Sequence, residues 1–321
     1  MNNYLIAFEE FLKENLKHEN PKNLYNPVKY ILESGGKRLR PLITIKLTDI
    51  LLNNFNKALP AAASLEVFHN FTLAHDDIMD NAKMRRGKET MNSKWNNNTA
   101  ILSGDVMLIL AYELLNNYEG SVFKELNKQL TKSSRLVCEG QQSDMDFSTQ
   151  KLISEKDYFE MIKNKTAELI ACSFLFSGII SNSTEINKNL LYEIGLNLGI
   201  AFQLEDDYLD CFGDEIKFGK KIGGDILEKK KTLMFINTNE NLDNTSKKDF
   251  EKIFYSDFID EEEKIKTIKS FYVKSGSDEY LKNQVKLYYE KSINLINQLE
   301  LDDLKKNEII SFSKILLNRQ I

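Results

Sequence analysis

The stretch PAAASLEVFHNFTLAHDDIMD, residues 60–80, decides the fold of this chain. Pro60 suits the first turn of a helix, because the backbone N–H that proline lacks would have no helical partner there. A run of alanines follows, and Leu65, Phe68 and Leu73 then recur at helical spacing. The stretch therefore predicts a helix of several turns.

The end of this helix carries an unusual set of acidic residues. Asp76 and Asp80 are four positions apart, so a helix places their carboxylates on one face, one turn apart. Like charges at this spacing repel, and the C-terminal end of a helix is the unfavourable pole for anions. A local rule broken in this way is typical of a functional site and indicates a bound cation.

The same pattern returns at residues 203–210, QLEDDYLD, after the apolar run IGLNLGIAF. Asp206 and Asp210 are again four positions apart. One such motif is consistent with a solvated acidic helix end, but two copies, each ending an apolar helix, favour a shared chemical role. Mg²⁺ is usually held by a few carboxylates together with phosphate oxygens of a substrate. The two motifs therefore predict a Mg²⁺–diphosphate site between two facing helices.

The composition limits the class of protein. The chain has 321 residues, 42% of them hydrophobic, and a formal net charge of −5, which argues against nucleic-acid binding. Cys138, Cys172 and Cys211 have no CxxC or metal-binding spacing. Together with the lack of a recognisable signal peptide, they favour a reducing, cytoplasmic location. The most apolar stretch, residues 169–180, is too short to span a bilayer, so no membrane span is expected.

Helical periodicity continues through the rest of the chain. It is clear in YLIAFEEFLKENL at residues 4–16 and in AILSGDVMLILAYELL at residues 100–115. Few valines and no alternation of apolar and polar residues argue against sheets, and no linker rich in glycine, serine or proline marks a boundary. We expect an all-α fold, a single domain over residues 1–321 with roughly ten or more helices packed as one bundle.

A basic loop precedes the central helix. It reads ESGGKRLRP at residues 33–41 and supplies the cations Lys37, Arg38 and Arg40. Pro41 opens the next helix, and the unpaired N–H groups of a helix start add to the side-chain charges. The loop is interpreted as an anion site.

Further basic residues accompany both acidic motifs. Arg85 and Arg86 lie a few residues beyond the first motif and predict contacts with the phosphate oxygens that a metal leaves uncovered. Lys165 opens a strongly apolar helix, an unfavourable place for a cation unless an anion lies nearby. The lysine-rich segment 212–233 follows the second motif, contains several glycines and is interpreted as a lid over a polyanion.

One pattern points to a different chemistry. Glu66 and His69 match the Glu-x-x-His motif of di-iron helical bundles. Those bundles need two such pairs, and His18 and His75 have no glutamate three positions earlier. The di-iron interpretation is therefore disfavoured. His69 precedes Asp76 by about two helical turns, so it is expected to reach the same cavity.

Taken in order, GGKRLRP, HDDIMD, RRG, KT, QLEDDYLD and FGKKIGGD resemble the trans-isoprenyl diphosphate (polyprenyl) synthase family, and most closely its bacterial short-chain members. The resemblance covers roughly residues 30–235. It implies an isoprenoid synthase-type helical bundle around a deep central cavity, usually in a homodimer. It also implies Mg²⁺-dependent condensation of isopentenyl diphosphate with an allylic diphosphate, namely dimethylallyl, geranyl or farnesyl diphosphate. The allylic substrate loses pyrophosphate, the double bond of isopentenyl diphosphate attacks the carbocation, and a proton leaves.

The resemblance also assigns roles by position. The matches to the family's direct Mg²⁺ ligands are Asp76, Asp80 and Asp206, and the matches to residues that support the metals or act through water are Asp77, Asp207 and Asp210. The matches to the isopentenyl diphosphate site are Lys37, Arg40, His69 and Arg86. The matches around the allylic diphosphate are Arg85, Lys165, Thr166, Gln203, Lys220 and Lys230. Catalysis is thus expected of the metal-binding aspartates together with Lys165 and Lys220. Glu205 is a small departure, because relatives often carry glutamine there.

Product length is expected to depend on Phe71. It lies five residues before Asp76, about 7–8 Å deeper along the helix, where its ring would form the floor of a tail pocket. Phe68, one turn deeper, would form a second floor. With an aromatic residue at the position of Phe71, the chain resembles the short-chain members of the family, which make farnesyl or geranylgeranyl diphosphate. The motif DDIMD lacks the two-residue insertion that many bacterial farnesyl diphosphate synthases of the family carry. The resemblance therefore favours geranylgeranyl diphosphate as the product, with a farnesyl diphosphate synthase as the alternative.

Two further alternatives share the fold. Terpene cyclases usually carry an Asn/Ser/Glu-type second metal motif and need no isopentenyl diphosphate site, whereas this chain has DDYLD and GGKRLRP. Non-catalytic subunits of heteromeric prenyl synthases lose aspartate motifs, and both are intact here. The synthase interpretation is therefore favoured.

Overall fold

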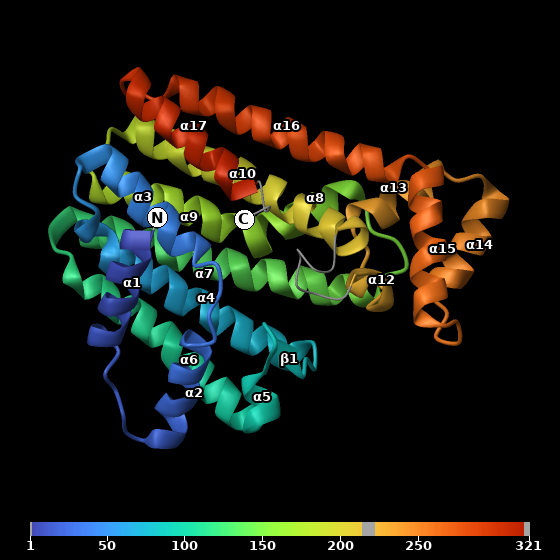
Figure 1. Cartoon of the computed structure of the whole chain (residues 1–321), viewed down its shortest axis with the longest axis horizontal. Coiled ribbons are helices and arrows are strands. Elements are labelled where there is room, and N and C mark those ends of the chain that lie inside the picture. Colours follow the sequence, from blue (N-terminus) through green and yellow to red (C-terminus); the bar gives the residue numbers. More distant parts are fainter. Residues whose placement is uncertain (1, 214–221, 318–321) are drawn as a thin grey trace. The chain divides into compact units, whose positions relative to one another are not determined.

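Helices make up almost all of the structure, a computed structural model that describes residues 2–213 and 222–317 (Figure 1). The chain divides into two compact units, Met1–Lys132 with Cys172–Leu191, and Ser133–Ala171 with Tyr192–Ile321. The boundaries between the units fall inside three helices: α7 (Gly120–Thr149), α9 (Glu168–Ile180) and α10 (Glu185–Phe212). The all-α prediction is confirmed, while the expectation of a single domain stays a prediction.

The first unit contains the N-terminal elements. In chain order they are α1 (Asn2–Asn15), α2 (Lys22–Leu32), α3 (Leu39–Leu52), η1 (Phe55–Ala58), α4 (Leu59–Met79), β1 (Met84–Arg85), β2 (Lys88–Glu89), α5 (Met91–Lys94), α6 (Asn97–Leu114) and η2 (Leu115–Asn117).

The second unit contains the remaining elements. In chain order they are α8 (Glu155–Ile162), the π-helix η3 (Lys163–Ala167), α12 (Gly224–Leu227), α13 (Leu233–Asn241), α14 (Asn244–Phe254), α15 (Glu261–Lys274), α16 (Ser277–Gln298) and α17 (Asp303–Leu317).

Helix α4 is the core of the first unit. It begins at Leu59 with Pro60 in its first turn, as predicted, and packs mainly against α6 and α3. Its alanines and Leu65 are fully buried, because small side chains let neighbouring helices approach closely. The buried Ser64 hydroxyl donates a 2.6 Å hydrogen bond to the Ala111 carbonyl of α6. The most apolar part of α4 thus fixes the position of its acidic C-terminal end.

The chain beyond α4 forms a short hairpin that the sequence did not predict. Strands β1 and β2 pair antiparallel, with Met84 opposite Glu89. Arg86 and Gly87 form the turn, and both have positive φ, 52° and 73°. A two-residue turn with two positive φ values matches the twist of a hairpin, and glycine suits its second position. The hairpin fixes the backbone directions of Arg85 and Arg86.

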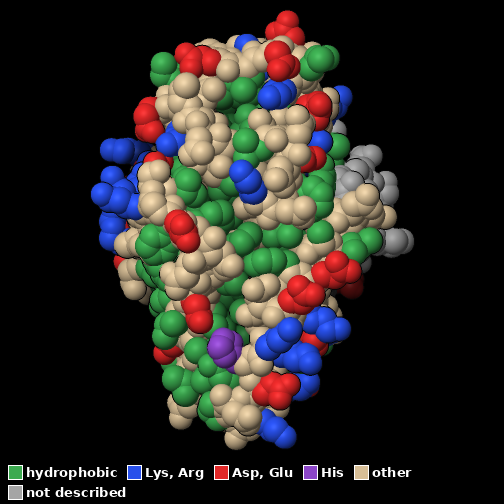
Figure 2. Space-filling model, turned by 90° about the vertical axis from the view of Figure 1, so that its left-hand side faces the viewer, with side chains coloured by type: hydrophobic (Ala, Val, Ile, Leu, Met, Phe, Trp, Pro, Cys, Tyr) green, Lys and Arg blue, Asp and Glu red, His purple; other side chains and the backbone are tan. Residues whose placement is uncertain are grey.

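Helix α6 combines a buried face with an apolar outer face. It packs on α4, α2 and α5, but Ile101, Leu102 and Ile109 are 43%, 58% and 63% exposed. Among the described residues, the stretch Asn97–Asn117 is long and apolar enough to cross a membrane, a property that the core helices of soluble proteins also have. Figure 2 shows hydrophobic side chains reaching the surface on one face of the molecule, with basic and acidic groups around them.

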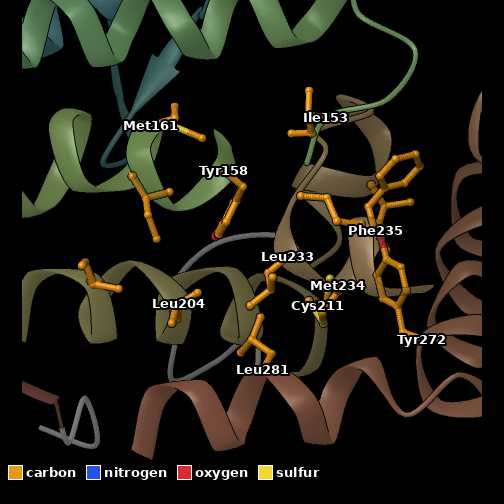
Figure 3. Close-up of a cluster of buried hydrophobic side chains, with 14 of the residues drawn as sticks. Ile153, Tyr158, Met161, Leu204, Cys211, Leu233, Met234, Phe235, Tyr272 and Leu281 are labelled. Atoms are coloured by element: carbon orange, nitrogen blue, oxygen red, sulfur yellow. The ribbon is translucent and has the colours of Figure 1, made fainter. Parts of the chain in front are cut away.

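The second unit has a core of its own, rich in aromatic side chains. It joins the end of α10 to α8, α13, α15 and α16, through residues that include Tyr158, Leu204, Phe235 and Tyr272 (Figure 3). The Phe235 ring also packs against the Phe254 ring at a tilt of 39°, with ring centroids 4.4 Å apart. This packing holds the last turns of α10, which carry the second acidic motif.

Candidate functional site

The first acidic motif ends α4. Asp76 is partly buried, Asp77 is buried and Asp80 is exposed. The Asp80 backbone N–H donates to the Asp76 carbonyl at 2.9 Å, so the helical register continues to Asp80. The carboxylates of Asp76 and Asp80 therefore follow one another at the helix end, as their spacing predicted.

Arg85 folds back onto this motif. Its Nε lies 2.6 Å from Asp77 Oδ1, and its Nη2 lies 3.4 Å from Asp76 Oδ2. Burial raises the pKa of Asp77, while the Arg85 guanidinium acts in the opposite direction. The central carboxylate of the motif is thus compensated by a cation of the chain itself, and Asp76 and Asp80 are its more exposed carboxylates.

His75 anchors the same helix end to α6. Its Nε2 lies 3.1 Å from the Ile101 carbonyl oxygen and 3.7 Å from Asp105 Oδ1. A Cβ atom on Gly104 would lie 2.3 Å from His75 Nε2, so only glycine leaves room for the ring. The contact fixes the last turn of α4 one residue before Asp76.

The cations of the basic loop have different surroundings, and Arg38 is bonded within the chain. Arg38, expected to help bind an anion, is instead buried and held by three acceptors of the chain. Its Nε, Nη1 and Nη2 donate to Glu9 at 2.8 Å, Glu66 at 2.7 Å and the Leu32 carbonyl at 2.5 Å. Burial lowers the pKa of Arg38, but Glu66 and Glu9 together raise it above its ordinary value. The expectation for Arg38 is therefore wrong, because two carboxylates already neutralise it.

The same contact bears on the di-iron interpretation. Glu66 Oε1 accepts from Arg38 at 2.7 Å and from Asn70 Nδ2 at 3.1 Å. This buried carboxylate therefore anchors the basic loop through Arg38. The contact explains the glutamate of the Glu-x-x-His pattern without a metal ion.

Arg40 and His69 form a partly buried pair. Arg40 Nη1 lies 3.2 Å from His69 Nε2. Burial lowers the pKa of His69 well below 6.5, and the Arg40 and Arg86 charges lower it further, so the ring is neutral and its Nε2 accepts the Arg40 hydrogen bond. Burial also lowers the pKa of Arg40 to about 10, which still leaves it a cation at neutral pH. Its buried Nε has no hydrogen-bond partner among the described residues, so one directed donor remains for an anion.

Arg86 and Lys37 complete this basic group. The Arg86 Nη1 donates to the Gly35 carbonyl, and a Cβ on Gly36, which has a φ of 129°, would collide with the Arg86 guanidinium. Lys37 follows in the same loop and is exposed. The structure therefore brings Lys37, Arg40, His69 and Arg86 into one region of the first unit, as the family resemblance implied.

Phe71 and Phe68 lie on the buried face of α4. Phe71 is 8% exposed and Phe68 is fully buried, with ring centroids 5.5 Å apart. The Phe71 ring also meets the His75 ring edge-on at 4.8 Å. The three rings form a continuous aromatic row that runs along α4 towards Asp76.

The second acidic motif lies in the last turns of α10. Asp207 is buried and accepts from the Tyr158 hydroxyl at 2.5 Å and from Gln203 Nε2 at 2.7 Å. Figure 3 shows the Tyr158 hydroxyl directed towards the helix that carries Leu204. Burial raises the pKa of Asp207 well above its ordinary value and the nearby Asp225 raises it further, while both hydrogen bonds act in the opposite direction. Tyr158 was not among the predicted site residues.

Asp225 is a second residue that the sequence reasoning missed. Its backbone N–H donates to Asp210 Oδ2 at 2.9 Å. Burial raises the pKa of Asp225 to about 7; Lys230 lowers it, whereas Asp210 and Asp206 raise it. The motif FGKKIGGD ends at Asp225, so the signal was present, but no spacing rule linked this residue to Asp210.

The predicted cations of this unit are paired with acids. Lys165 Nζ lies 2.5 Å from Asp144 Oδ2 of α7, and Lys230 Nζ lies 2.9 Å from Glu228 and 3.6 Å from Asp225. Burial would lower the pKa of Lys230, but these two carboxylates raise it above its ordinary value. Lys220 lies outside the described residues.

Thr166 and Gln203 are also brought together, because the Thr166 hydroxyl donates to Gln203 Oε1 at 2.8 Å. Asp144 was not a predicted site residue, since only the fold pairs it with Lys165.

The donor set is consistent with divalent cations shared with a substrate. No group of three or more His, Cys, Asp or Glu side chains within the described part of the chain is arranged to hold a metal by itself. However, burial raises the pKa of Asp225, and the nearby carboxylates of Asp210 and Asp206 raise it further. Such a cluster is relieved by a hard cation, and Mg²⁺ normally completes its six ligands with water and phosphate oxygens.

Comparison with known proteins identifies relatives along the whole chain. Residues 21–271 match the polyprenyl synthetase family. A geranylgeranyl diphosphate synthase of Saccharolobus solfataricus is 35% identical over 97% of this chain and 93% of its own. A crystal structure of a geranylgeranyl pyrophosphate synthase superposes with a TM-score of 0.95 at 42% identity, covering 100% of this chain and 99% of the other. The structure of a geranylgeranyl pyrophosphate synthetase from the archaeon Geoglobus acetivorans superposes with a TM-score of 0.88 at 30% sequence identity. The superposition covers 99% of this chain and 98% of the other. The similarity thus extends beyond the bacterial members.

Proposed function

Because this chain belongs to the polyprenyl synthetase family and is a trans-prenyltransferase, we propose that it condenses isopentenyl diphosphate with allylic diphosphates to make geranylgeranyl diphosphate. The proposed product length is supported by the aromatic row Phe68–Phe71–His75, which extends along α4 from the residue before Asp76 towards the start of the helix. The relatives named above carry the same product in their names.

The isopentenyl diphosphate site is proposed at the basic loop of the first unit. Neutral His69 accepts a hydrogen bond from Arg40 and so orients its guanidinium, whose Nε keeps a donor for a phosphate oxygen. Arg86, which donates to the Gly35 carbonyl, and the exposed Lys37 are proposed to add charge at the same loop. Guanidinium groups suit this task, because they hold phosphate oxygens in fixed, often bidentate geometry.

The allylic diphosphate is proposed to bind to two groups of residues. Arg85 stands beside Asp76 and Asp77, and Lys165, Thr166 and Gln203 are joined to their neighbours by hydrogen bonds. Lys230 and Lys220 complete the set, the latter on sequence grounds alone. These cations stabilise the charge that develops on the departing diphosphate, which is where electrostatic catalysis acts.

The aspartate motifs are proposed to hold Mg²⁺, the first through Asp76 and Asp80 and the second through Asp206 and Asp210. When bound, Mg²⁺ neutralises diphosphate charge and makes it a better leaving group. Arg85 pairs with Asp77 beside Asp76, and Tyr158 and Gln203 hold Asp207 in place. Asp225, bound through its backbone to Asp210, is added to this group as a residue that acts on Asp210 or through water.

A homodimer is also proposed. The exposed side chains Ile101, Leu102 and Ile109 on α6 give this helix an apolar outer face that a second copy would bury. We therefore attribute the apolar character of Asn97–Asn117 to subunit contact and not to a membrane span. Sedimentation of the purified protein tests this, and a monomer at micromolar concentration would contradict it. A cytoplasmic location is proposed as well, consistent with the free thiols of Cys138, Cys172 and Cys211.

The proposed reaction is tested by supplying each substrate in turn. Purified protein is incubated with Mg²⁺, labelled isopentenyl diphosphate and dimethylallyl, geranyl or farnesyl diphosphate, and the dephosphorylated products are sized by chromatography. All three starters are expected to give products that stop at twenty carbons. A stop at fifteen carbons would indicate a farnesyl diphosphate synthase, and no incorporation by folded protein would favour a cyclase or a non-catalytic subunit.

A further inference from the structure

The π-helix η3, Lys163–Ala167, interrupts the regular helix between α8 and α9. It contains Lys165 and Thr166, both assigned above to the allylic diphosphate. A π turn inserts one extra residue and changes the direction of the side chains around it, and such turns are frequent at functional sites. The turn must therefore be held in place by its surroundings.

Two glycines of other helices touch the backbone of this turn. A Cβ on Gly140 of α7 would lie 2.3 Å from Lys165 N and 2.8 Å from the Asn164 carbonyl carbon. A Cβ on Gly199 of α10 would lie 2.5 Å from Ala167 Cα. The obstructing atoms are mostly backbone atoms, which cannot rotate away as the end of a side chain can. Both helices thus press on η3 at points where only glycine fits.

A polar side chain follows each glycine by one helical turn. Asp144 lies four residues after Gly140 and accepts from Lys165 Nζ at 2.5 Å. Gln203 lies four residues after Gly199 and accepts from the Thr166 hydroxyl at 2.8 Å. Residues four apart share one face of a helix, so each flanking helix offers η3 a backbone contact and a side-chain acceptor on the same face.

We propose that Gly140, Gly199 and Asp144 are positioning residues that clamp the π turn and set where Lys165 and Thr166 meet the allylic diphosphate. The proposal rests on the function assigned to Lys165 and Thr166 above. The proposal predicts different effects on the binding of the two substrates. The clamp acts on the binding of the allylic substrate, whereas the basic loop of the first unit, proposed to bind isopentenyl diphosphate, contributes no residue to it.

The clamp reverses the usual effect of an alanine substitution. In an unconstrained helix interior, Gly→Ala stabilises the fold, because alanine has the higher helix propensity. At Gly140 and Gly199 the new methyl group would displace the η3 backbone, so the melting temperature is expected to fall. Gly178 on α9 is the matched control. A Cβ there would approach Leu191 Cδ1 at 2.8 Å, the mobile end of a side chain, so its replacement is expected to be tolerated.

The experiment compares Gly140→Ala, Gly199→Ala and Gly178→Ala with the wild type. For the two clamp variants we expect a lower melting temperature and a KM for the allylic diphosphate raised by about 10- to 100-fold, in line with small misplacements of binding groups. The KM for isopentenyl diphosphate and the product length are expected to stay within about twofold. A raised melting temperature, or an equal rise in both KM values, would overturn the clamp.

Two further measurements keep the proposal testable. Asp144→Asn removes the ion pair without moving backbone, and we expect it to raise the allylic KM alone, with rescue by Asp144→Glu; an unchanged KM contradicts the role of Asp144. Amide hydrogen exchange at Lys165 and Thr166 needs no activity, so it distinguishes failure of the clamp from failure of the proposed function. Exchange is expected to be faster in Gly140→Ala than in Gly178→Ala, and equal rates would overturn the clamp.

Discussion

The two aspartate motifs share the DDxxD pattern, but their central carboxylates lie in different electrostatic environments. At the end of α4, the buried central carboxylate of Asp77 is compensated by the Arg85 guanidinium at 2.6 Å. At the end of α10, the equivalent Asp207 is held by the neutral donors Tyr158 and Gln203, and Asp225 adds a further carboxylate nearby. The central carboxylate of the first motif thus has a cationic partner, whereas that of the second has neutral donors and a pKa that burial raises well above its ordinary value. The stability of the second unit should therefore depend more strongly on pH.

The largest expected effect comes from removing one metal-binding carboxylate of either motif. We expect Asp76→Ala and Asp206→Ala each to lower kcat by at least about 10²- to 10³-fold, the usual consequence of losing an electrostatic stabiliser of the transition state. Initial rates at saturating Mg²⁺ and substrates measure the loss. Near wild-type turnover in either variant would remove that motif from the metal site.

The next effect is a pH dependence of stability that arises in the second motif. Asp225 has a pKa of about 7 in the folded protein and 3.8 as its ordinary value. The stability it contributes is thus fully present below about pH 4 and is lost as the pH rises through 7. We expect Asp225 to contribute about 2–4 kcal/mol to the unfolding free energy that the Mg²⁺-free protein loses across this range, and Asp225→Asn to remove that contribution.

Urea unfolding between pH 4.5 and 8 without divalent cations measures this dependence. Asp77→Asn in the first motif is the matched control, since Arg85 partly offsets the effect of burial on the pKa of that carboxyl. An effect of Asp77→Asn as large as that of Asp225→Asn would contradict the proposed difference between the motifs.

A smaller effect separates the two ways of holding the central carboxylate. Arg85→Met leaves Asp77 buried without its cation, and we expect a loss of about 1–3 kcal/mol at pH 7. Tyr158→Phe removes one of two neutral donors to Asp207, and about 0.5–1.5 kcal/mol is expected. Chemical unfolding of the two variants under the same conditions gives the comparison. A larger loss for Tyr158→Phe would reverse it.

The smallest effect has the opposite pH sign and lies in the first unit. The pKa of His69 is well below 6.5 because the ring is buried near Arg40 and Arg86. The stability linked to this histidine is present above pH 6.5 and is lost as the pH falls, because only the unfolded chain takes up the proton. We expect a loss of about 1 kcal/mol between pH 6.5 and 5.5. His69→Gln keeps an acceptor for Arg40 but cannot take up the proton, so the unfolding free energy of this variant, measured with urea, should vary less between pH 6.5 and 5.5. The same loss in the variant as in the wild type would show that His69 is not its source.

Local spacing predicted α4, the two acidic motifs and the basic loop. Residues four apart on a helix must share a face, whatever the rest of the fold does. The same reasoning failed for Arg38, because its partners Glu9 and Glu66 lie 29 and 28 positions away in the chain. A basic residue beside a glycine pair looks the same in sequence whether it binds a substrate or a buried carboxylate.

The contacts around the second motif could not be predicted for a related reason. Tyr158 reaches Asp207 across 49 positions, and the π turn at Lys165 lies against Gly140 and Gly199, which are far from it in sequence. Glycines inside apolar helices suggest close packing but do not name the partner. Only the fold shows which backbone they meet.

The most direct test of the account compares the products of the wild type and of Phe71→Ala. Both proteins are incubated with Mg²⁺, labelled isopentenyl diphosphate and farnesyl diphosphate, and the dephosphorylated products are sized. If Phe71, packed between Phe68 and His75, forms the floor of the tail pocket, the wild type stops at twenty carbons and the variant continues to longer chains. Identical product distributions would contradict this assignment, and a wild type that adds no isoprene unit would contradict the proposed function itself.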